Sequence, residues 1–242
     1  MIDAVLFDWG DTLMQWVWDE SLLEAGHRAG LAAIGRDGLP QSDAVAARFA
    51  EAYMPYLWVP GAVEEIEYPG LVRELLAHFG ITLSDGELER FLDAEHDAWQ
   101  PARRLGATTH ALLESLRARG LKLALVSNAF DPPPLLHRDL ERMGVAERLD
   151  VAVFSSEIGK RKPHAAIFER ALDAVGVEPE RAVFVGDQLV ADVGGARAAG
   201  MTTVQALWFR ADETPNAPEP DFQAFTQMDV LNVVRRLDTA RA

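Results

Sequence analysis

The 242-residue sequence contains no cysteine. This absence excludes disulfide bonds, thiol catalysis, cysteine-based zinc sites and iron–sulfur clusters. Basic residues are also scarce, with 23 Lys and Arg against 38 Asp and Glu and a formal net charge of −15 at pH 7. Because nucleic acids and anionic membranes are bound through an exposed excess of Lys and Arg, we expect neither of them as a partner.

Long hydrophobic runs are missing as well. No apolar stretch approaches the roughly 18 residues that a membrane span requires. The N-terminal Met1-Ile2-Asp3 lacks the basic region of a secretory signal. Hydrophobic residues still make up 49% of the chain, which is enough to build a core. We therefore expect a soluble, cytoplasmic globular protein, either a monomer or a homodimer.

Short apolar runs alternate with amphipathic stretches over most of the chain. The runs lie at 4–7, 121–126, 151–154, 182–185 and 203–207. The amphipathic patterns between the later runs lie at 109–119, 135–143, 165–175 and 191–199. Strands that are apolar throughout and alternate with helices are typical of a parallel sheet covered on both faces. The sequence thus predicts an α/β fold with a doubly wound, Rossmann-type parallel sheet.

Residues 14–104 break this alternation. They contain no convincing strand pattern and instead predict helices at 19–34, 42–58, 69–79 and 84–98. Ser84 followed by Glu87 has the spacing of a capping box. The segment is too long for a simple crossover. We predict a core domain formed by residues 1–13 and 105–242, with a helical cap domain formed by residues 14–104.

Polar residues stand where several predicted strands end. Asp8 follows the first strand, Ser127 and Asn128 end the second, and Asp187 follows the fourth. Because ligands bind at the carboxyl ends of parallel strands, we expect these residues to converge on one edge of the sheet. Each acid taken alone could equally be a helix cap.

Clustered carboxylates at that edge would need a cation. Asp8, Asp187 and Asp192 would repel one another if packed together, and Mg²⁺ is a hard ion that prefers such oxygen ligands. Lys162 would add a second positive charge, and Ser127 a hydroxyl donor. Lysine is notable here, because the chain has only three lysines against 20 arginines. This combination predicts a phosphoryl site, in which a carboxylate attacks phosphorus to form an acyl phosphate.

Four segments carry a family resemblance. Phe7-Asp8-Trp9-Gly10-Asp11-Thr12-Leu13, Leu125-Val126-Ser127-Asn128, Lys162-Pro163 and Gly186-Asp187-x4-Asp192 resemble, in order and strand context, the four motifs of the haloacid dehalogenase-like (HAD) hydrolase superfamily. Most members of that superfamily are Mg²⁺-dependent phosphatases. The helical insertion between the first two motifs is similar to the cap of its first cap class. The resemblance implies a HAD-like fold, Mg²⁺ as cofactor and hydrolysis of a small phosphomonoester.

The resemblance also implies roles for individual residues. Asp8 would be the nucleophile. The metal would be held by Asp8, Asp187, Asp192 and the main-chain carbonyl of Gly10. Ser127 and Lys162 would hold the phosphoryl oxygens, and Asn128 would line the entry.

Gly10 is the main departure from the family pattern. Phosphatases of the superfamily usually carry a second Asp two positions after the nucleophile, which protonates the leaving oxygen and then activates water. Asp11 is the obvious substitute for the missing acid, although its one-residue offset favours a role in closing the loop. Three hypotheses therefore stay open: a phosphatase with a substitute acid, a 2-haloacid dehalogenase that needs neither acid nor metal, and a phospho-ligand-binding protein with little turnover.

Substrate choice would depend on the cap. Its aromatic residues could close over a substrate, although packing between cap and core is the more common role of such side chains. They are Trp16, Trp18, Tyr56, Trp58 and Trp99. Arg103 and Arg104 could meet a second anionic group of the substrate or be surface charges at the hinge. Four histidines lie on helical patterns without partners at ligand spacing, and we assign them no chemistry: His27, His78, His96 and His110.

Overall fold

β1 (Ala4–Phe7) lies in the middle of a six-stranded parallel sheet whose strand order is β5-β4-β1-β6-β7-β8. The computed structural model describes residues 1–57, 59 and 61–240. The other strands of this sheet are β4 (Lys122–Ser127), β5 (Val151–Phe154), β6 (Ala182–Gly186), β7 (Thr202–Ala206) and β8 (Phe222–Ala224). The predicted doubly wound α/β core is confirmed, and β8, which the sequence analysis did not predict, extends the sheet by one edge strand.

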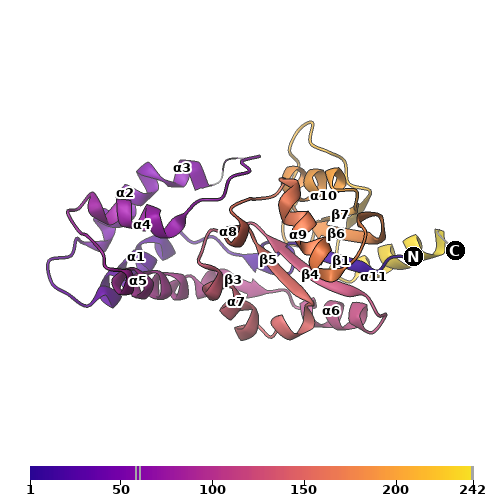
Figure 1. Cartoon of the computed structure of the whole chain (residues 1–242), viewed down its shortest axis with the longest axis horizontal. Helices are drawn as coiled ribbons and strands as arrows, with labels where there is room; N and C mark the ends of the chain where they lie inside the picture. Colours follow the sequence, from indigo (N-terminus) through magenta and orange to yellow (C-terminus); the bar gives the residue numbers. More distant parts are fainter. Residues whose placement is uncertain (58, 60, 241–242) are drawn as a thin grey trace.

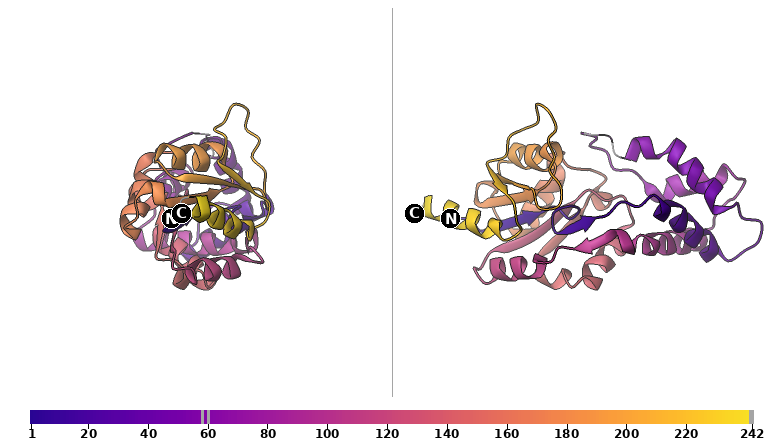
Figure 2. Two further views of the ribbon diagram at one scale, coloured as in Figure 1. Left: turned by 90° about the vertical axis from the view of Figure 1, so that its right-hand side faces the viewer. Right: turned by 180° about the vertical axis from the view of Figure 1, so that it is seen from behind.

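Both faces of the sheet are covered by helices, as Figures 1 and 2 show. Alternate residues of β1 serve the two faces: Val5 and Phe7 belong to one hydrophobic cluster, and Ala4 and Leu6 to another. The first cluster includes residues of α6 (Thr109–Arg117), α7 (Pro133–Arg142) and α11 (Asp229–Ala240). The second includes residues of α9 (Ala165–Val175) and α10 (Gly195–Ala198). This burial on two sides explains why the strands are apolar throughout.

Five helices form a separate unit, which we call the helical insert (residues 17–102). They are α1 (Ser21–Ile34), α2 (Ser42–Ala52), α3 (Met54–Leu57), α4 (Tyr68–Ala77) and α5 (Asp85–Ala98). Their apolar faces build a hydrophobic cluster of their own. The capping box of Ser84 and Glu87 begins α5 as predicted. The helix predicted at 42–58 is instead divided into α2 and α3, and Trp58 lies outside the described residues.

The insert is entered and left through two short paired strands. β2 (Met14–Trp16) and β3 (Arg103–Leu105) form an antiparallel pair. The expectation that residues 14–104 contain no strand is therefore wrong. Each strand has only three residues and pairs with a segment that is distant along the chain, so no local periodicity could reveal it.

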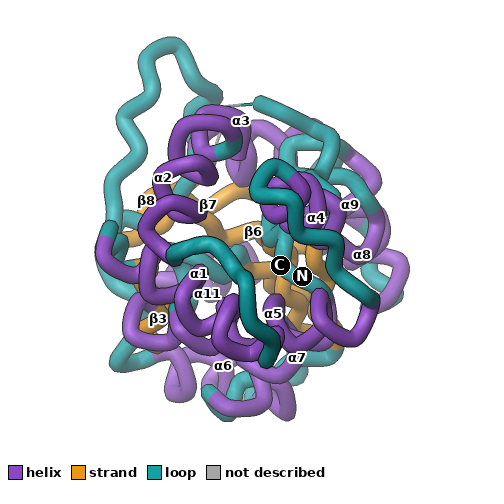
Figure 3. The backbone as a smooth tube through the Cα atoms, turned by 90° about the vertical axis from the view of Figure 1, so that its left-hand side faces the viewer, coloured by secondary structure: helices purple, strands orange, loops and turns teal. Residues whose placement is uncertain are grey.

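A second connection joins the insert to the core. The N–H of Glu65 donates to the carbonyl of Gly159 (3.1 Å), and the N–H of Arg161 donates to the carbonyl of Val63 (2.9 Å). Figure 3, viewed from the side of the insert, shows its helices in front of the strands. The insert thus lies over the carboxyl edge of the parallel sheet, where the candidate site was predicted.

Short helical turns complete the chain. They are α8 (Ser155–Ile158), the 3-10 turns Gln100–Ala102, Ala146–Arg148 and Pro179–Arg181, and a π-helical turn, Leu189–Gly194. The π-helical turn replaces the first turn of the helix predicted at 191–199. Among the described residues, no helix combines the length and apolarity needed to cross a membrane.

Candidate active site

Asp8 is the residue directly after β1, and its side chain is buried at the carboxyl edge of the sheet. Its backbone N–H donates to the carbonyl of Val185 in β6 (2.9 Å), which extends the strand pairing to the site itself. Nζ of Lys162 lies 2.5 Å from Oδ1 of Asp8, although the two residues are 154 positions apart in the sequence. The fold thus brings these two predicted site residues into direct contact.

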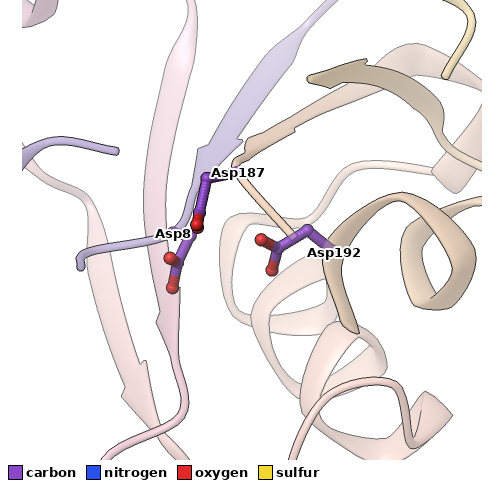
Figure 4. A group of neighbouring side chains, drawn as sticks. All are labelled: Asp8, Asp187 and Asp192. Atoms are coloured by element: carbon purple, nitrogen blue, oxygen red, sulfur yellow. The ribbon is translucent and has the colours of Figure 1, made fainter. Parts of the chain in front are cut away.

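Asp187 and Asp192 lie beside this pair. Asp187 directly follows β6, and Asp192 lies in the π-helical turn after it. Nζ of Lys162 is 2.7 Å from Oδ1 of Asp192, and Oδ2 of Asp192 accepts a hydrogen bond from the N–H of Gln188 (2.9 Å). Figure 4 shows the three carboxylates facing one shared space, and one oxygen from each lies within 4.8 Å of the others.

Gly186 leaves the room that Asp192 occupies. A Cβ atom at Gly186 would lie 2.4 Å from Cγ of Asp192, which is closer than two unbonded carbon atoms can approach. The glycine at the end of β6 therefore allows the carboxylate of Asp192 to reach the space between β1 and β6.

The cluster holds more negative than positive charge. Both carboxylate oxygens of Asp187 are buried and have no hydrogen-bond partner among the described residues. Burial, followed by the neighbouring carboxylates of Asp192 and Asp8, raises the pKa of Asp187 to about 9. Burial also raises the pKa of Asp8 to about 7, although the ammonium group of Lys162 opposes this. A buried all-oxygen set with an unsatisfied carboxylate has the chemistry that a hard divalent cation such as Mg²⁺ requires.

Lys162 is charged in spite of its burial. Burial acts to lower the pKa of its ammonium group, but the carboxylates of Asp192 and Asp8 outweigh burial and raise it. Asn128 holds the backbone of Lys162 at two points: its Oδ1 accepts from the N–H of Lys162 (2.7 Å), and its Nδ2 donates to the carbonyl of the same residue (3.1 Å). The side-chain amide predicted to line the entry is thus engaged with the lysine backbone.

Ser127 is the last residue of β4 and is buried at the same edge of the sheet, beside β1. Ser127 therefore lies at the edge of the sheet where the site residues were expected to meet.

Gly10 and Asp11 form the turn after Asp8. Among the described residues other than its two chain neighbours, none has an atom within 4 Å of the position that a Cβ atom would take at Gly10. Asp11 has a backbone φ of 54°, and its Oδ1 accepts from the N–H of Trp16 (3.0 Å). One oxygen of Asp11 therefore closes the turn into β2. Asp11 also lies close enough to Asp187 to help raise the pKa of that carboxyl group.

An aromatic pocket of about 60 Å³ lies between the insert and the core. Trp99 stacks on Trp16 with ring centroids 5.8 Å apart and lies 5.4 Å from the ring of Trp18. Tyr68 of the insert lies 4.8 Å from Phe130 of the core. Trp16 and Phe130 belong to the segments that follow Asp8 and Ser127, so the pocket is built partly by the loops of the acidic site.

The polar part of this pocket is a cluster that joins the insert to the core. We call it the joint cluster, and its members are Glu95, His96, Arg103, Asp131 and Asp139. His96 is fully buried, with Nδ1 2.9 Å from Asp131 and Nε2 3.0 Å from Asp139. Burial acts to lower the pKa of His96, but these two carboxylates raise it. Nε of Arg103 lies 3.3 Å from Asp139, and Nη1 of Arg103 donates to the carbonyl of His96 (3.0 Å).

Glu95 differs from the other acids of the joint cluster. It is buried, and it accepts a hydrogen bond from the hydroxyl of Tyr68 (2.8 Å). Burial raises the pKa of Glu95 to about 8, so its carboxyl group is mostly protonated at pH 7.

Sequence reasoning missed the joint cluster. It assigned His96 no chemistry, and it gave Arg103 either a second anionic group or a surface position. Arg103 is instead buried and paired with Asp139. The partners of His96 lie 35 and 43 residues away, so only the fold brings them together. Trp16, Trp18 and Trp99 line the aromatic pocket, although Trp18 is also half-exposed, and Tyr56 is largely exposed.

The fold and the site together define an α/β enzyme core with an acidic, lysine-containing site at its carboxyl edge. The family model of the haloacid dehalogenase-like hydrolases matches residues 2–200. The chain therefore belongs to this family, and it is a hydrolase.

Individual relatives agree with this assignment. The chain is 33% identical to a phosphoserine phosphatase of Thermus thermophilus, over 76% of this chain and 74% of the relative. It is 30% identical to a glyceraldehyde 3-phosphate phosphatase of Methanopyrus kandleri, over 98% of this chain and 99% of the relative. A HAD phosphatase of Thermococcus onnurineus superposes with a TM-score of 0.66 at 24% identity, over 96% of this chain and 98% of that one. A 2-haloacid dehalogenase of Pseudomonas syringae superposes with a TM-score of 0.64 at 21% identity, over 98% of this chain and all of that one. The two superpositions show the fold.

Proposed function

We propose that the protein is a Mg²⁺-dependent phosphatase that hydrolyses a small phosphomonoester through an aspartyl-phosphate on Asp8. The observation that carries this proposal is the buried carboxylate of Asp187, which has no hydrogen-bond partner among the described residues and faces Asp8 and Asp192. A buried acid of this kind makes little sense without a cation, and a cation beside a nucleophilic carboxylate and a lysine suits phosphoryl transfer.

The carboxylates of Asp8, Asp187 and Asp192 would hold the ion, with the main-chain carbonyl of Gly10 as a further ligand. When bound, Mg²⁺ supplies positive charge that favours the ionised forms of these carboxyl groups and neutralises phosphate oxygens.

The residues of the chain perform two displacements at phosphorus. First, an oxygen of Asp8 bonds to phosphorus, the bond from phosphorus to the ester oxygen breaks, and that oxygen leaves with the bonding electrons. Second, water attacks the aspartyl-phosphate, the bond from phosphorus to Asp8 breaks, and inorganic phosphate is released. Lys162 and Ser127 hold the phosphoryl oxygens in both steps, and Asn128 keeps the Lys162 backbone in place.

The leaving group would occupy the aromatic pocket, because two of its lining residues, Trp16 of β2 and Phe130, belong to the chain segments that follow Asp8 and Ser127. The named substrates of the relatives include phosphoserine, glyceraldehyde 3-phosphate, phosphoglycolate and ribulose 1,5-bisphosphate, all of them phosphate esters of small organic molecules. We extend only their shared chemistry, a phosphate ester of a small organic molecule, to this chain.

One observation favours a second candidate. Position 10 carries no acid. A 2-haloacid dehalogenase does not need an acid there, because Asp8 would displace halide directly. The acidic set of Asp187 and Asp192 has no role in that reaction, so we rank it second. Halide release from 2-haloacids in the presence of EDTA would identify it.

Phosphate release from an aryl and an alkyl ester tests the proposal. 4-Nitrophenol leaves without protonation, whereas an alkoxide needs an acid. We expect Mg²⁺-dependent turnover of 4-nitrophenyl phosphate that EDTA abolishes and that Asp8→Asn lowers by about a thousandfold or more. Full activity of Asp8→Asn would overturn the proposed nucleophile.

The open space at Gly10 allows a sharper variant. Gly10→Asp adds a carboxyl group at a position where a Cβ atom meets no described atom within 4 Å. Because general acid catalysis contributes roughly 10²–10⁴-fold, we expect this variant to accelerate alkyl ester hydrolysis far more than aryl ester hydrolysis. Gly10→Asn is the matched control, since it has the same shape but transfers no proton.

A further inference from the structure

We propose that the aromatic pocket selects phosphate esters whose leaving group is compact and carries no negative charge. This inference rests on the proposed phosphatase function and adds the substrate class to it. The relatives' named substrates do not settle the question, because phosphoserine and phosphoglycolate carry a carboxylate beside the phosphate, whereas glyceraldehyde 3-phosphate does not.

The cations of the pocket are already paired with protein carboxylates. Among the described lining residues, the cationic groups are His96 and Arg103. Both ring nitrogens of His96 are engaged, by Asp131 and Asp139. Arg103 lies against Asp139 and the carbonyl of His96, and its side chain is 5% exposed. A carboxylate or second phosphate on the leaving group would therefore find no cation without breaking a buried ion pair, which is costly.

The acid Asp131 adds to the discrimination against a negatively charged leaving group. The side chain of Asp131 is 23% exposed, so its negative charge is the part of the joint cluster that reaches toward an occupant. A like charge placed against it in a partly desolvated pocket is strongly unfavourable. Glu95, in contrast, is mostly protonated and adds little charge of its own.

The remaining walls favour a small uncharged group. They are aromatic and aliphatic, with Trp16, Trp99 and Phe130 among them. The volume of about 60 Å³ is well below the roughly 150 Å³ cavity that accommodates benzene, so a leaving group of a few heavy atoms fits without rearrangement, whereas the nitrophenyl group of the assay ester requires the pocket walls to move.

Two isosteric esters test the proposal. 2-Phosphoglycolamide and 2-phosphoglycolate differ only by an amide in place of a carboxylate. We expect the Mg²⁺-loaded enzyme to use the amide with a kcat/KM at least about tenfold higher. Equal values, or a preference for the carboxylate, would overturn the proposal. The calorimetric affinities of both esters give the same comparison without turnover.

Substitution of Asp131 assigns the effect to the pocket. Asp131→Asn retains an oxygen for His96 but removes the charge, so the amide-to-carboxylate ratio should fall toward one. The matched control is Asp93→Asn, which removes a half-exposed carboxylate of α5 that pairs with Arg138 outside this pocket and should leave the ratio unchanged. An unchanged ratio in Asp131→Asn would refute the role of this residue.

The experiments distinguish failure of the proposed phosphatase function from failure of the selectivity proposal. If neither these esters nor 4-nitrophenyl phosphate releases phosphate with Mg²⁺, the proposed function is wrong. The calorimetric affinities then decide the pocket's selectivity alone: tighter binding of the amide supports it, and tighter or equal binding of the carboxylate overturns it.

Discussion

The molecule contains two largely buried acidic clusters, one at the carboxyl edge of the sheet and one where the insert meets the core, and they differ in how their charge is compensated. The site at the sheet edge has three carboxylates, those of Asp8, Asp187 and Asp192, for the single ammonium group of Lys162. In the joint cluster, Asp131 and Asp139 face His96 and Arg103.

The difference separates a site whose negative charge needs a further cation from a cluster whose charges are already paired within the protein. In the joint cluster, the two carboxylates are paired with the two basic side chains. Burial keeps the carboxyl group of the fifth member, Glu95, mostly uncharged. The sheet-edge site lacks positive charge, and its pKa values rise accordingly for Asp187 and Asp8. Acidic clusters are common in proteins, and here the deficit of positive charge, together with burial, supports the proposed cation site.

Among the substitutions that compare the two clusters, removal of the ammonium group of Lys162 from the sheet-edge site should have the largest effect on activity. Lys162→Met leaves three buried carboxylates without their ammonium partner and removes a contact to the phosphoryl oxygens. We expect phosphate release to fall by about 10²–10³-fold or more, measured with 4-nitrophenyl phosphate and Mg²⁺.

Lys160→Met is the matched control for that substitution. Lys160 stands two positions earlier, forms a surface ion pair with Glu64, and should be replaceable with less than about 1 kcal/mol change in the free energy of unfolding. Equal losses of activity in the two variants would contradict a specific role of Lys162 at the site.

Removal of a carboxylate from the joint cluster should instead lower stability more than activity. Asp139→Asn takes the charge that His96, Arg103 and Gln100 share. We expect the free energy of unfolding to fall by about 3 to 5 kcal/mol in urea denaturation at pH 7, because the buried Arg103 loses its carboxylate partner and His96 loses one of its two. Turnover of 4-nitrophenyl phosphate by the folded protein should change by less than about tenfold, since Asp139 does not contact Asp8 and the leaving group of this ester carries no carboxylate for His96 or Arg103 to bind. A larger loss of activity than of stability would contradict the structural role.

The smallest effect should come from Glu95→Gln, which should alter only the pH dependence of stability. The pKa of Glu95 is about 8 in the fold against an ordinary value of 4.5. The native state therefore holds a proton that the unfolded chain loses, so stability declines as pH rises from about 4.5 to about 8. The variant lacks this decline and should be the more stable protein at pH 9, while activity at pH 7 stays within about twofold. Glu89→Gln, on the exposed side of α5, should keep the wild-type decline.

Much of the core could be predicted from the sequence because its signals are local. Fully buried strands are apolar at every position, and the helices between them carry their own periodicity. β2, β3 and β8 have only three residues each, and their pairing depends on distant segments, so no window of sequence could reveal them.

Some features of the candidate site could likewise be predicted from the sequence, and others could not. Asp8, Ser127 and Asp187 could be placed because each stands at a strand end, and parallel strands share one edge. The hydrogen bonds of Asn128 to the Lys162 backbone could not, because they need the actual distance between two loops. The burial of His96 and Arg103 was equally hidden, since their helical and strand patterns do not show what packs over them.

The paired strands β2 and β3 give the molecule a modular design. They carry the chain into and out of the insert side by side, so the segment between them could be exchanged without moving a strand of the parallel sheet. Every residue of the sheet-edge site is encoded outside that segment, whereas the aromatic pocket takes most of its wall from within it. Variation in the insert can therefore change which molecule is accepted while the reaction stays the same.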